Sequence, residues 1–199
     1  MKIIGITGGI GCGKSTVSRY LEEKGFYIVD ADKIARRIVE PEDPDTVLPR
    51  LRELFGEEIV DSSGRLRRKA LAEIVFNSPE EKKKMDDLML GKIVGIIKSR
   101  AEECRKAPAG RKAVFLDVPL LFETDLHTIT DENWLVDVAD DLRIARVMER
   151  DGATRKQVED RIRNQMPQEE KRKMATLVLD NGGDLKELYG EIDRELQRL

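Results

Sequence analysis

The sequence is poor in cysteine and histidine and contains no long hydrophobic run. Cys12 and Cys104 are its only cysteines and His127 is its only histidine, which excludes a disulfide framework and a zinc cluster built from these residues. No stretch approaches the ~18 apolar residues that a membrane span requires, and the apolar run in Met1–Ile6 is too short for a signal peptide. The low cysteine count is compatible with a reducing compartment, so we expect a cytoplasmic protein.

An excess of positive charge is also absent. The 36 lysines and arginines against 39 aspartates and glutamates leave a formal net charge of −3 at pH 7. A dedicated nucleic-acid-binding protein usually carries a clear positive excess, so we expect no nucleic-acid partner. The length of 199 residues suits one domain, or one domain with a compact insertion. A composition of 40% hydrophobic and 38% charged residues is typical of a soluble globular chain.

Five short apolar runs alternate with segments of helical spacing. They are rich in isoleucine, valine and leucine and lack period-two alternation, which is typical of strands covered on both faces. The runs are Ile3–Thr7, Tyr27–Asp30, Ala113–Val118, Trp134–Val138 and Leu177–Asp180. This alternation predicts an α/β fold with a parallel sheet and right-handed crossovers.

Residues 32–106 contain no good strand, so we expect a helical insertion between the second and third strands. Apolar residues at helical spacing predict one helix over about Asp45–Phe55. A second helix is expected to start at Ser78, an N-cap residue that is followed by a proline at the first helical position. The remaining segments, 1–31 and 107–199, would form the α/β core.

The strongest motif lies directly after the first predicted strand. Gly8–Ser15 fits the pattern G-x-x-x-x-G-K-S/T at every fixed position, and a segment of helical spacing follows it. Glycines let the backbone turn successive N–H groups toward phosphate oxygens, and the start of a helix adds its positive dipole end. Lys14 can then bridge the β- and γ-phosphates, and the Ser15 hydroxyl can ligate Mg²⁺. This context disfavours the alternative, a glycine-rich turn with a chance lysine.

Cys12 lies inside this loop and has two interpretations. The start of a helix can make its thiol acidic and prone to oxidation. Alternatively, the residue is there because it is small, since the loop binds phosphate through its backbone. We favour this second interpretation.

Aspartates follow two of the predicted strands. Asp30 and Asp32 follow the second strand, and Asp117 lies at the end of the third. Because ligands bind at the carboxyl ends of strands in open α/β sheets, we expect all three at the same edge as the phosphate loop. Asp32 can accept the proton of an attacking hydroxyl, and Asp117 can hold Mg²⁺ through water. Capping of the next helix is an equally strong interpretation for Asp32 and a stronger one for Asp30.

Arginines are frequent after the fourth predicted strand, where Arg143, Arg146 and Arg150 share one helical face. A planar guanidinium suits the oxygens of a transferring phosphoryl group. A solvated helix of mixed charge is the stronger interpretation for most of these arginines. Asn181, in the turn after the fifth strand, offers hydrogen bonds to a base edge, although an ordinary turn is favoured there.

The motif by itself leaves the fate of the bound nucleotide open. No asparagine in the chain is followed by lysine, so the Asn-Lys-x-Asp guanine signature of common GTPases is missing, and the chain is short for a motor. A kinase for a small molecule needs an acceptor pocket, a carboxylate beside the acceptor hydroxyl and arginines over the phosphates. We favour such a kinase over a nucleotide-gated regulatory module, which has no need of a second carboxylate.

Several further segments, taken together with the loop, resemble the dephospho-coenzyme A kinases. The matching segments are Gly5–Thr16, Val29–Arg36, Phe55-Gly56, Gly64–Leu66, Val118–Glu123, Arg146, Arg150-Asp151, Gln165 and Asp180–Gly183. The Asp-Ala-Asp segment at 30–32 and Pro-Leu-Leu-Phe-Glu at 119–123 are far more specific than the loop. The resemblance covers nearly the whole chain.

The resemblance implies a P-loop kinase fold with a five-stranded parallel sheet of order 2-3-1-4-5, a helical acceptor-binding insertion at 32–106 and a lid at 140–165. It implies ATP-dependent phosphorylation of the ribose 3′-hydroxyl of dephospho-coenzyme A, the last step of coenzyme A synthesis, with Mg²⁺ as cofactor. The oligomeric state stays open.

The resemblance also implies roles for individual residues. Asp32 becomes the catalytic base, with Lys14 and Arg146 as further catalytic residues. The implied ATP contacts are Gly9, Gly11, Cys12, Gly13, Lys14, Ser15, Thr16, Arg150 and, on the adenine side, Asn181. The implied acceptor contacts are Thr7, Asp32, Pro119, Leu120, Leu121 and Glu123. The implied magnesium ligands are Ser15 and, through water, Asp117.

Two positions depart from the family's pattern. The family often has a His-Pro pair late in the long helix of the insertion, where this chain has Leu90-Gly91, and an Ala-Asp pair before the fifth strand, where this chain has Ala175-Thr176. If that histidine helps to bind the acceptor, acceptor affinity differs in this chain. Neither change touches the phosphate loop or Asp32, so the expected reaction stands.

Overall fold

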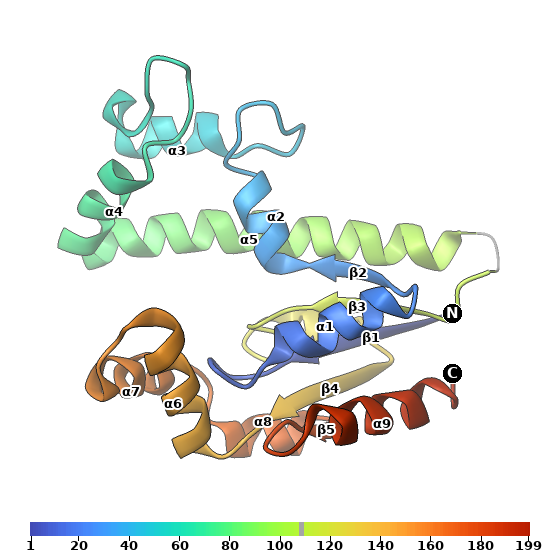
Figure 1. Cartoon of the computed structure of the whole chain (residues 1–199). Coiled ribbons are helices and arrows are strands. Elements are labelled where there is room, and N and C mark those ends of the chain that lie inside the picture. The colour runs from blue at the N-terminus through green and yellow to red at the C-terminus, as the bar shows by residue number, and fades with distance from the viewer. Residues whose placement is uncertain (108–109) are drawn as a thin grey trace. The chain divides into compact units, whose positions relative to one another are not determined.

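The structure, a computed structural model, describes residues 1–107 and 110–199 and contains a five-stranded parallel sheet (Figure 1). The strand order β2-β3-β1-β4-β5 confirms the predicted fold class and topology. The strands are β1 (Lys2–Thr7), β2 (Tyr27–Asp30), β3 (Ala113–Asp117), β4 (Glu132–Asp137) and β5 (Leu177–Asp180). Each lies within two residues of its predicted bounds. The central strands leave a nearly unbroken apolar run in the sequence because they are largely buried on both faces, whereas the edge strands β2 and β5 are partly exposed.

Helices separate the strands along the described chain. They are α1 (Lys14–Glu23), α2 (Ala31–Arg37), α3 (Leu48–Phe55), α4 (Arg68–Asn77), α5 (Pro79–Lys106), α6 (Asp140–Asp151), α7 (Arg155–Arg163), α8 (Gln168–Met174) and α9 (Leu185–Leu196), with short 3₁₀ turns at Glu57–Ile59 and Asp125–Thr128. Across the described residues, no helix combines the length and the apolar character that crossing a membrane demands.

The chain folds as two compact units, residues 1–29 with 100–199 and residues 30–99. The first unit holds β1, β3, β4 and β5. Their register aligns Ile6 with Asp117, Thr7 with Leu135 and Asp137 with Asp180. These strands therefore end together at one edge, which is the edge where an α/β sheet binds its ligands.

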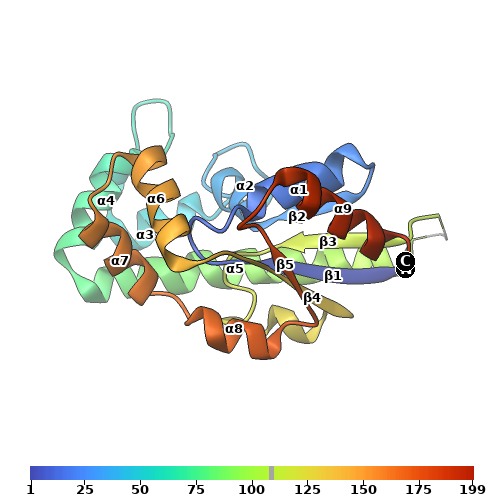
Figure 2. The same ribbon diagram turned by 60° about the horizontal axis from the view of Figure 1, so that its bottom comes forward.

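The core of the first unit lies between the sheet and two helices. The fully buried Ile4, Ile6 and Trp134 of the sheet belong to the same apolar cluster as Val17 and Leu21 of α1 and, from α9, Leu188 and Ile192. Figure 2 shows α1 and α9 on one side of the sheet and α8 on the other. Burial of this apolar surface fixes the strands and, with them, the loops at their carboxyl ends.

The second unit is helical, as predicted, and apart from an isolated bridge between Val60 and Leu66 its described residues 32–99 form no β-structure. The predicted helix over Asp45–Phe55 starts three residues later, at Leu48. The prediction was wrong because Pro49 lacks an N–H and fits only within the first helical turn. The preceding residues instead form a turn in which Thr46 N donates to Asp43 O at 3.0 Å. Ser78 caps α5 as predicted, accepting a hydrogen bond from Glu81 N at 3.2 Å.

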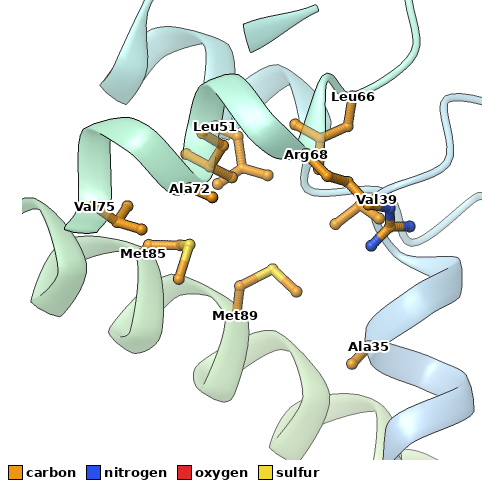
Figure 3. A pocket seen from close by; sticks show the side chains of 10 residues that line it. Ala35, Val39, Leu51, Leu66, Arg68, Ala72, Val75, Met85 and Met89 are labelled. Atoms are coloured by element: carbon orange, nitrogen blue, oxygen red, sulfur yellow. The ribbon is translucent and has the colours of Figure 1, made fainter. Parts of the chain in front are cut away.

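An apolar cavity of about 260 Å³ lies inside this second unit (Figure 3). Its walls come from α2, α3, α4, α5 and the segments next to them. The lining residues are Ala35, Val39, Leu51, Leu66, Arg68, Leu71, Ala72, Val75, Met85 and Met89. Protein interiors are normally close-packed, so an open apolar space with a single charged side chain at its wall is a candidate ligand site.

Candidate active site

The phosphate loop, Gly8–Ser15, joins β1 to α1 and contains two glycines in the left-handed region. Gly11 has φ of 81° and Gly13 has φ of 83°. A Cβ at Gly11 would lie 2.5 Å from the carbonyl oxygen of Arg143, and one at Gly13 would lie 2.1 Å from Asn181 Nδ2. Glycine is therefore needed at both positions, for the backbone conformation and for the close approach of neighbours.

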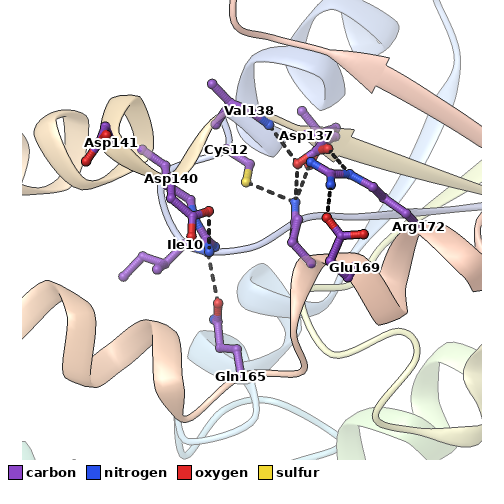
Figure 4. Close-up of polar contacts among 12 residues, drawn as sticks. Ile10, Cys12, Asp137, Val138, Asp140, Asp141, Gln165, Glu169 and Arg172 are labelled. Atoms are coloured by element: carbon purple, nitrogen blue, oxygen red, sulfur yellow. Dashed lines mark hydrogen bonds and ion pairs between the residues drawn. The ribbon is translucent and has the colours of Figure 1, made fainter.

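Hydrogen bonds from outside the motif hold this loop in shape. Within the loop, Cys12 N donates to Gly9 O at 3.1 Å. Gln165 accepts a hydrogen bond at Oε1 from Ile10 N at 3.0 Å (Figure 4). Asn181 donates through Nδ2 to Cys12 O at 2.7 Å. The loop is therefore preorganised by fixed partners, which lowers the ordering cost of binding a ligand.

Lys14 and Asp117 form an ion pair at the floor of the loop. The Lys14 ammonium contacts Asp117 Oδ1, and Ser18 Oγ donates to Asp117 Oδ2 at 2.5 Å. Asp117 is only 3% exposed, so these two partners compensate a buried carboxylate. The expectation that Asp117 lies beside the phosphate loop is met by these contacts.

The Cys12 side chain is buried in the loop, and burial is the main cause that raises the pKa of its thiol. The nearby charge of Arg143 opposes this shift without reversing it. The thiol therefore stays protonated, which contradicts the interpretation of an acidic cysteine. Our favoured interpretation, a small residue in a loop that acts through its backbone, agrees with this burial.

Sequence reasoning missed a polar cluster around Asp137, at the end of β4 (Figure 4). Its carboxylate accepts hydrogen bonds from Val138 N and Gln168 Nε2, both at 2.8 Å, and from Arg172 Nε at 2.5 Å. Gln168 Nε2 also lies 3.4 Å from Cys12 Sγ. The available signal was the aspartate itself, which ends a buried strand just as Asp117 does.

The arginines of α6 lie in three different environments. Arg143 is 4% exposed and pairs with Asp140, and a Cβ at Gly9 would lie 2.6 Å from its Nη1. The interpretation of a solvated side chain is therefore wrong for Arg143, which is packed against the loop. Arg146 donates through Nη2 to Asn181 O at 3.0 Å, so it contacts the residue that holds Cys12 O.

Arg150 is exposed and paired within its own region. Its Nε lies 2.7 Å from Asp151 Oδ1, and Arg161 contacts the other oxygen of the same carboxylate at 2.7 Å. The hydrogen bond from Arg150, supported by Arg161, lowers the pKa of Asp151 to about 2. Asp151 therefore keeps its charge near neutral pH and keeps both guanidinium groups close together.

The segment after β3, residues 118–123, is tied to the same edge. Thr7 donates through Oγ1 to Pro119 O at 3.0 Å. Glu123 Oε1 lies 2.8 Å from Nζ of Lys171, a fully buried side chain. Leu121 is fully buried beside Gly5, whereas Leu120 is 38% exposed. Of these two expected acceptor contacts, only Leu120 therefore has a side chain facing solvent.

Asp30 and Asp32 have different environments, which separates two interpretations that the sequence left open. Asp30 is the N-cap of α2 and accepts a hydrogen bond at Oδ1 from Lys33 N at 2.9 Å. Asp32 lies in the first turn of α2 with an exposed side chain, and no partner among the described residues occupies its carboxylate. Capping therefore belongs to Asp30, and Asp32 is available for other chemistry.

The arrangement supplies what phosphoryl transfer requires on the donor side: a preorganised amide loop, a lysine and a carboxylate. Among the residues that the structure describes, no group of three or more metal-ligating side chains forms a protein-only metal site. Magnesium at kinase sites is held by one or two protein oxygens together with substrate phosphates and water. The exposed hydroxyl of Ser15 and the carboxylate of Asp117 fit that donor set.

The chain is similar in sequence to dephospho-CoA kinases along almost its whole length. A model of the dephospho-CoA kinase family matches residues 2–187. A dephospho-CoA kinase from Carboxydothermus hydrogenoformans is 38% identical over 198 residues, which cover 100% of this chain and 94% of the relative. Another from Leptospira interrogans is 40% identical over 189 residues, which cover 95% and 88% respectively.

The chain is also similar to solved structures along almost its whole length. A crystal structure of a Thermus thermophilus protein is 39% identical, with a TM-score of 0.78 over 100% of this chain and 97% of that one. A dephospho-CoA kinase from Campylobacter jejuni is 27% identical, with a TM-score of 0.74 over 98% and 95%. A shikimate kinase from Acinetobacter baumannii, at 16% identity and a TM-score of 0.53 over 100% and 94%, shares the fold.

The loop geometry predicts that Gly11→Ala is more harmful than Gly25→Ala. Both glycines have positive φ, 81° and 86°, but a Cβ at Gly25 has no neighbour within 4 Å. We expect Gly25→Ala to lower the free energy of unfolding by about 1 kcal/mol, the cost of the left-handed backbone alone. Gly11→Ala should lower it by at least about 2 kcal/mol, because the carbonyl of Arg143 must also move.

Urea unfolding and ADP titration measure this difference. Gly11→Ala should weaken ADP binding by roughly tenfold or more, since a displaced loop no longer presents its amides together. Gly25→Ala should leave ADP affinity unchanged. Equal losses of stability and equal ADP affinities in the two variants would contradict the described packing of Arg143 on the loop.

Proposed function

The chain belongs to the dephospho-CoA kinase family, whose members catalyse the ATP-dependent phosphorylation of dephospho-CoA in the last step of coenzyme A biosynthesis, and we propose that it phosphorylates the ribose 3′-hydroxyl of that acceptor. The observation that carries the proposal is the preformed phosphate loop with Lys14 paired to Asp117, in a chain matched by the family over residues 2–187. Asp32, whose carboxylate serves no helix cap, supports the assignment of a base.

On the donor side, Gly9 and the residues from Gly11 to Thr16 are proposed to surround the ATP phosphates, whereas the N–H of Ile10 is bonded to Gln165. When the nucleotide binds, the Lys14 ammonium is proposed to move from the Asp117 carboxylate to the phosphates. The exchange replaces one anionic partner with another. Ser15, and Asp117 through water, would hold Mg²⁺, which would neutralise part of the negative charge of the phosphates. Asn181, whose amide group already bonds Cys12 O, would contact the adenine side of the loop.

In the transfer step, Asp32 is proposed to orient the acceptor hydroxyl and to take its proton. Arg146 and Arg150 would neutralise negative charge on the transferring group. The two arginines lie on α6, in the region 140–165 that we assign as the lid. Closure of this region would exclude water and so prevent wasteful ATP hydrolysis.

The helical region 32–106 is the proposed acceptor-binding insertion. Ala35 lies one helical turn from Asp32 on α2, and Ala35 is part of the apolar cavity wall. An acceptor held at Asp32 can therefore extend along α2 toward the cavity. We assign the cavity to the part of the acceptor that extends away from the reacting sugar. Thr7 and the 119–123 segment are proposed as further contacts of the acceptor.

A direct assay tests the reaction. Purified protein with ATP, Mg²⁺ and dephospho-CoA should release ADP and form a product heavier by one phosphate, at one product per ADP. Coupled ADP detection and mass spectrometry measure the two quantities. A nucleotide-gated regulatory module, the alternative without an acceptor, predicts slow ADP release that dephospho-CoA does not accelerate and no heavier product.

The role of Asp32 predicts that Asp32→Asn lowers kcat by roughly 10²–10⁴-fold with the fold intact, because general-base catalysis contributes about that much. Asp30→Asn is the matched control. It removes a carboxylate two residues away but retains an amide oxygen able to cap α2. Steady-state kinetics and circular dichroism of both variants provide the comparison. Near-normal turnover of Asp32→Asn would remove Asp32 from the role of base.

The position of the cavity predicts different kinetic effects for two alanine-to-leucine substitutions on α4. Ala72 lines the cavity, whereas Ala70 does not. We expect Ala72→Leu to raise the KM for dephospho-CoA by about tenfold or more, with kcat and the KM for ATP little changed. The substitution adds three carbon atoms at the cavity wall, and even one methylene of misfit in an apolar pocket has an effect of about tenfold. Ala70→Leu should leave all three constants near those of the wild type. Equal KM values in the two variants would place the acceptor arm elsewhere.

A further inference from the structure

Residues 165–171, which we call the positioning segment, connect α7 to the first turn of α8 and contact the phosphate loop. Gln165 accepts a hydrogen bond at Oε1 from Ile10 N, at 3.0 Å. Gln168 Nε2 lies 3.4 Å from Cys12 Sγ. The segment therefore touches the loop at two residues, and both contacts lie in the part before the motif's lysine (Figure 4).

The same segment also contacts the loop that follows β3. Met166 N donates to Glu123 Oε1 at 3.3 Å, and Lys171 Nζ lies 2.8 Å from the same oxygen. Lys171 Nζ also donates to Pro119 O at 3.5 Å, and that carbonyl accepts from Thr7 Oγ1 as well. Through Gln165, Met166, Gln168 and Lys171, the positioning segment thus contacts both the phosphate loop and the 119–123 segment.

A fixed point on the sheet anchors the positioning segment. Asp137 ends β4 and accepts a hydrogen bond from Gln168 Nε2 at 2.8 Å. The next residue after the segment, Arg172, contacts the other oxygen of that carboxylate at 2.5 Å. Gln168 and Asp137 are both buried, so the hydrogen bond between them is shielded from water and electrostatically strong.

We propose that the positioning segment fixes the phosphate loop and the 119–123 segment in one relative placement, with Gln165 as the positioning residue for the donor loop. The inference rests on the proposed function, which assigns the phosphate loop to ATP and the 119–123 segment to the acceptor. Phosphoryl transfer depends on holding donor and acceptor in line, and a misplacement of about 1 Å can cost roughly 10²-fold in rate. A single element bonded to both loops supplies that constraint.

Gln165 is the residue that best tests this role. Lys171 is a poor probe, because removing one partner of a buried ion pair destabilises a protein by about 3–5 kcal/mol. Gln165 is only partly buried and makes one hydrogen bond to the loop. Gln165→Met keeps the length of the side chain and removes the accepting oxygen, whereas Gln165→Glu keeps an accepting oxygen.

The experiment compares both variants with a control that loses hydrogen bonds at the opposite edge of the sheet. Thr176→Val removes a hydroxyl that accepts from Asn133 N at 2.9 Å and donates to Asn133 O at 3.1 Å, beside the start of β5. For each protein we would measure amide hydrogen exchange at Ile10, the Kd for ADP, kcat, and the amount of coenzyme A formed per ADP released.

In Gln165→Met we expect exchange at Ile10 to accelerate about fivefold, the equivalent of one lost hydrogen bond. The kcat should fall roughly tenfold or more and the yield of coenzyme A per ADP should fall below one. The Kd for ADP should change less than about tenfold, since one hydrogen bond to the loop is lost. Gln165→Glu should restore protection of Ile10, and Thr176→Val should keep a yield of one with wild-type exchange at Ile10.

Three results would overturn the proposal. Unchanged exchange at Ile10 in Gln165→Met would show that Gln165 does not hold the loop. A kcat and yield equal to those of Thr176→Val would reduce Gln165 to a structural residue. Exchange at Ile10 in Gln165→Glu as fast as in Gln165→Met would show that the accepting oxygen is not the cause of the effect. Failure of the proposed function is distinct, because the wild-type protein would then form no coenzyme A while exchange at Ile10 still reports on Gln165.

Discussion

The active site depends on one constraint: the phosphate loop must keep several backbone N–H groups directed at a ligand, so its other polar groups need partners elsewhere. Cys12 N bonds Gly9 O inside the loop. The remaining contacts come from distant parts of the chain, Gln165 for Ile10 N and Asn181 for Cys12 O. The glycines allow the backbone to adopt the shape of the loop, and the hydrogen bonds with Gln165 and Asn181 stabilise that shape.

Charge at the carboxyl edge of the sheet follows the same logic. Asp117 and Asp137 end β3 and β4, the two strands on either side of β1. Both are almost fully buried, and each has a cation and a neutral donor. Lys14 and Ser18 compensate Asp117, and Arg172 and Gln168 compensate Asp137. An unpaired buried carboxylate would cost several kcal/mol, on the order expected for desolvation of an ion. The hydrogen bonds and ion pairs of these two carboxylates therefore allow ionised groups to be buried at this edge of the sheet without destabilising the fold.

Local patterns in the sequence predicted the strands, a parallel sheet and the phosphate loop, because buried strands and glycine-rich turns leave local signatures, whereas the strand order was predicted only by the family resemblance. The predicted start of α3 was wrong, because the apolar spacing was given more weight than the requirement that Pro49 lie in the first turn. The partners of the loop left no such signature. Gln165 and Asn181 lie 155 and 169 residues from the loop residues they bond, and glutamine and asparagine are common on surfaces. Such contacts arise only from the tertiary fold.

The pairing of Lys14 with Asp117 has a consequence for the turnover cycle. The ammonium already has an anionic neighbour before a nucleotide arrives, so binding exchanges one counter-charge for another instead of neutralising a bare cation. The same carboxylate can pair with Lys14 again when the nucleotide leaves, which compensates part of the lost attraction. The affinity for the nucleotide is therefore lower than it would be with an unpaired lysine. In exchange, the lysine has an anionic partner whenever the site is empty.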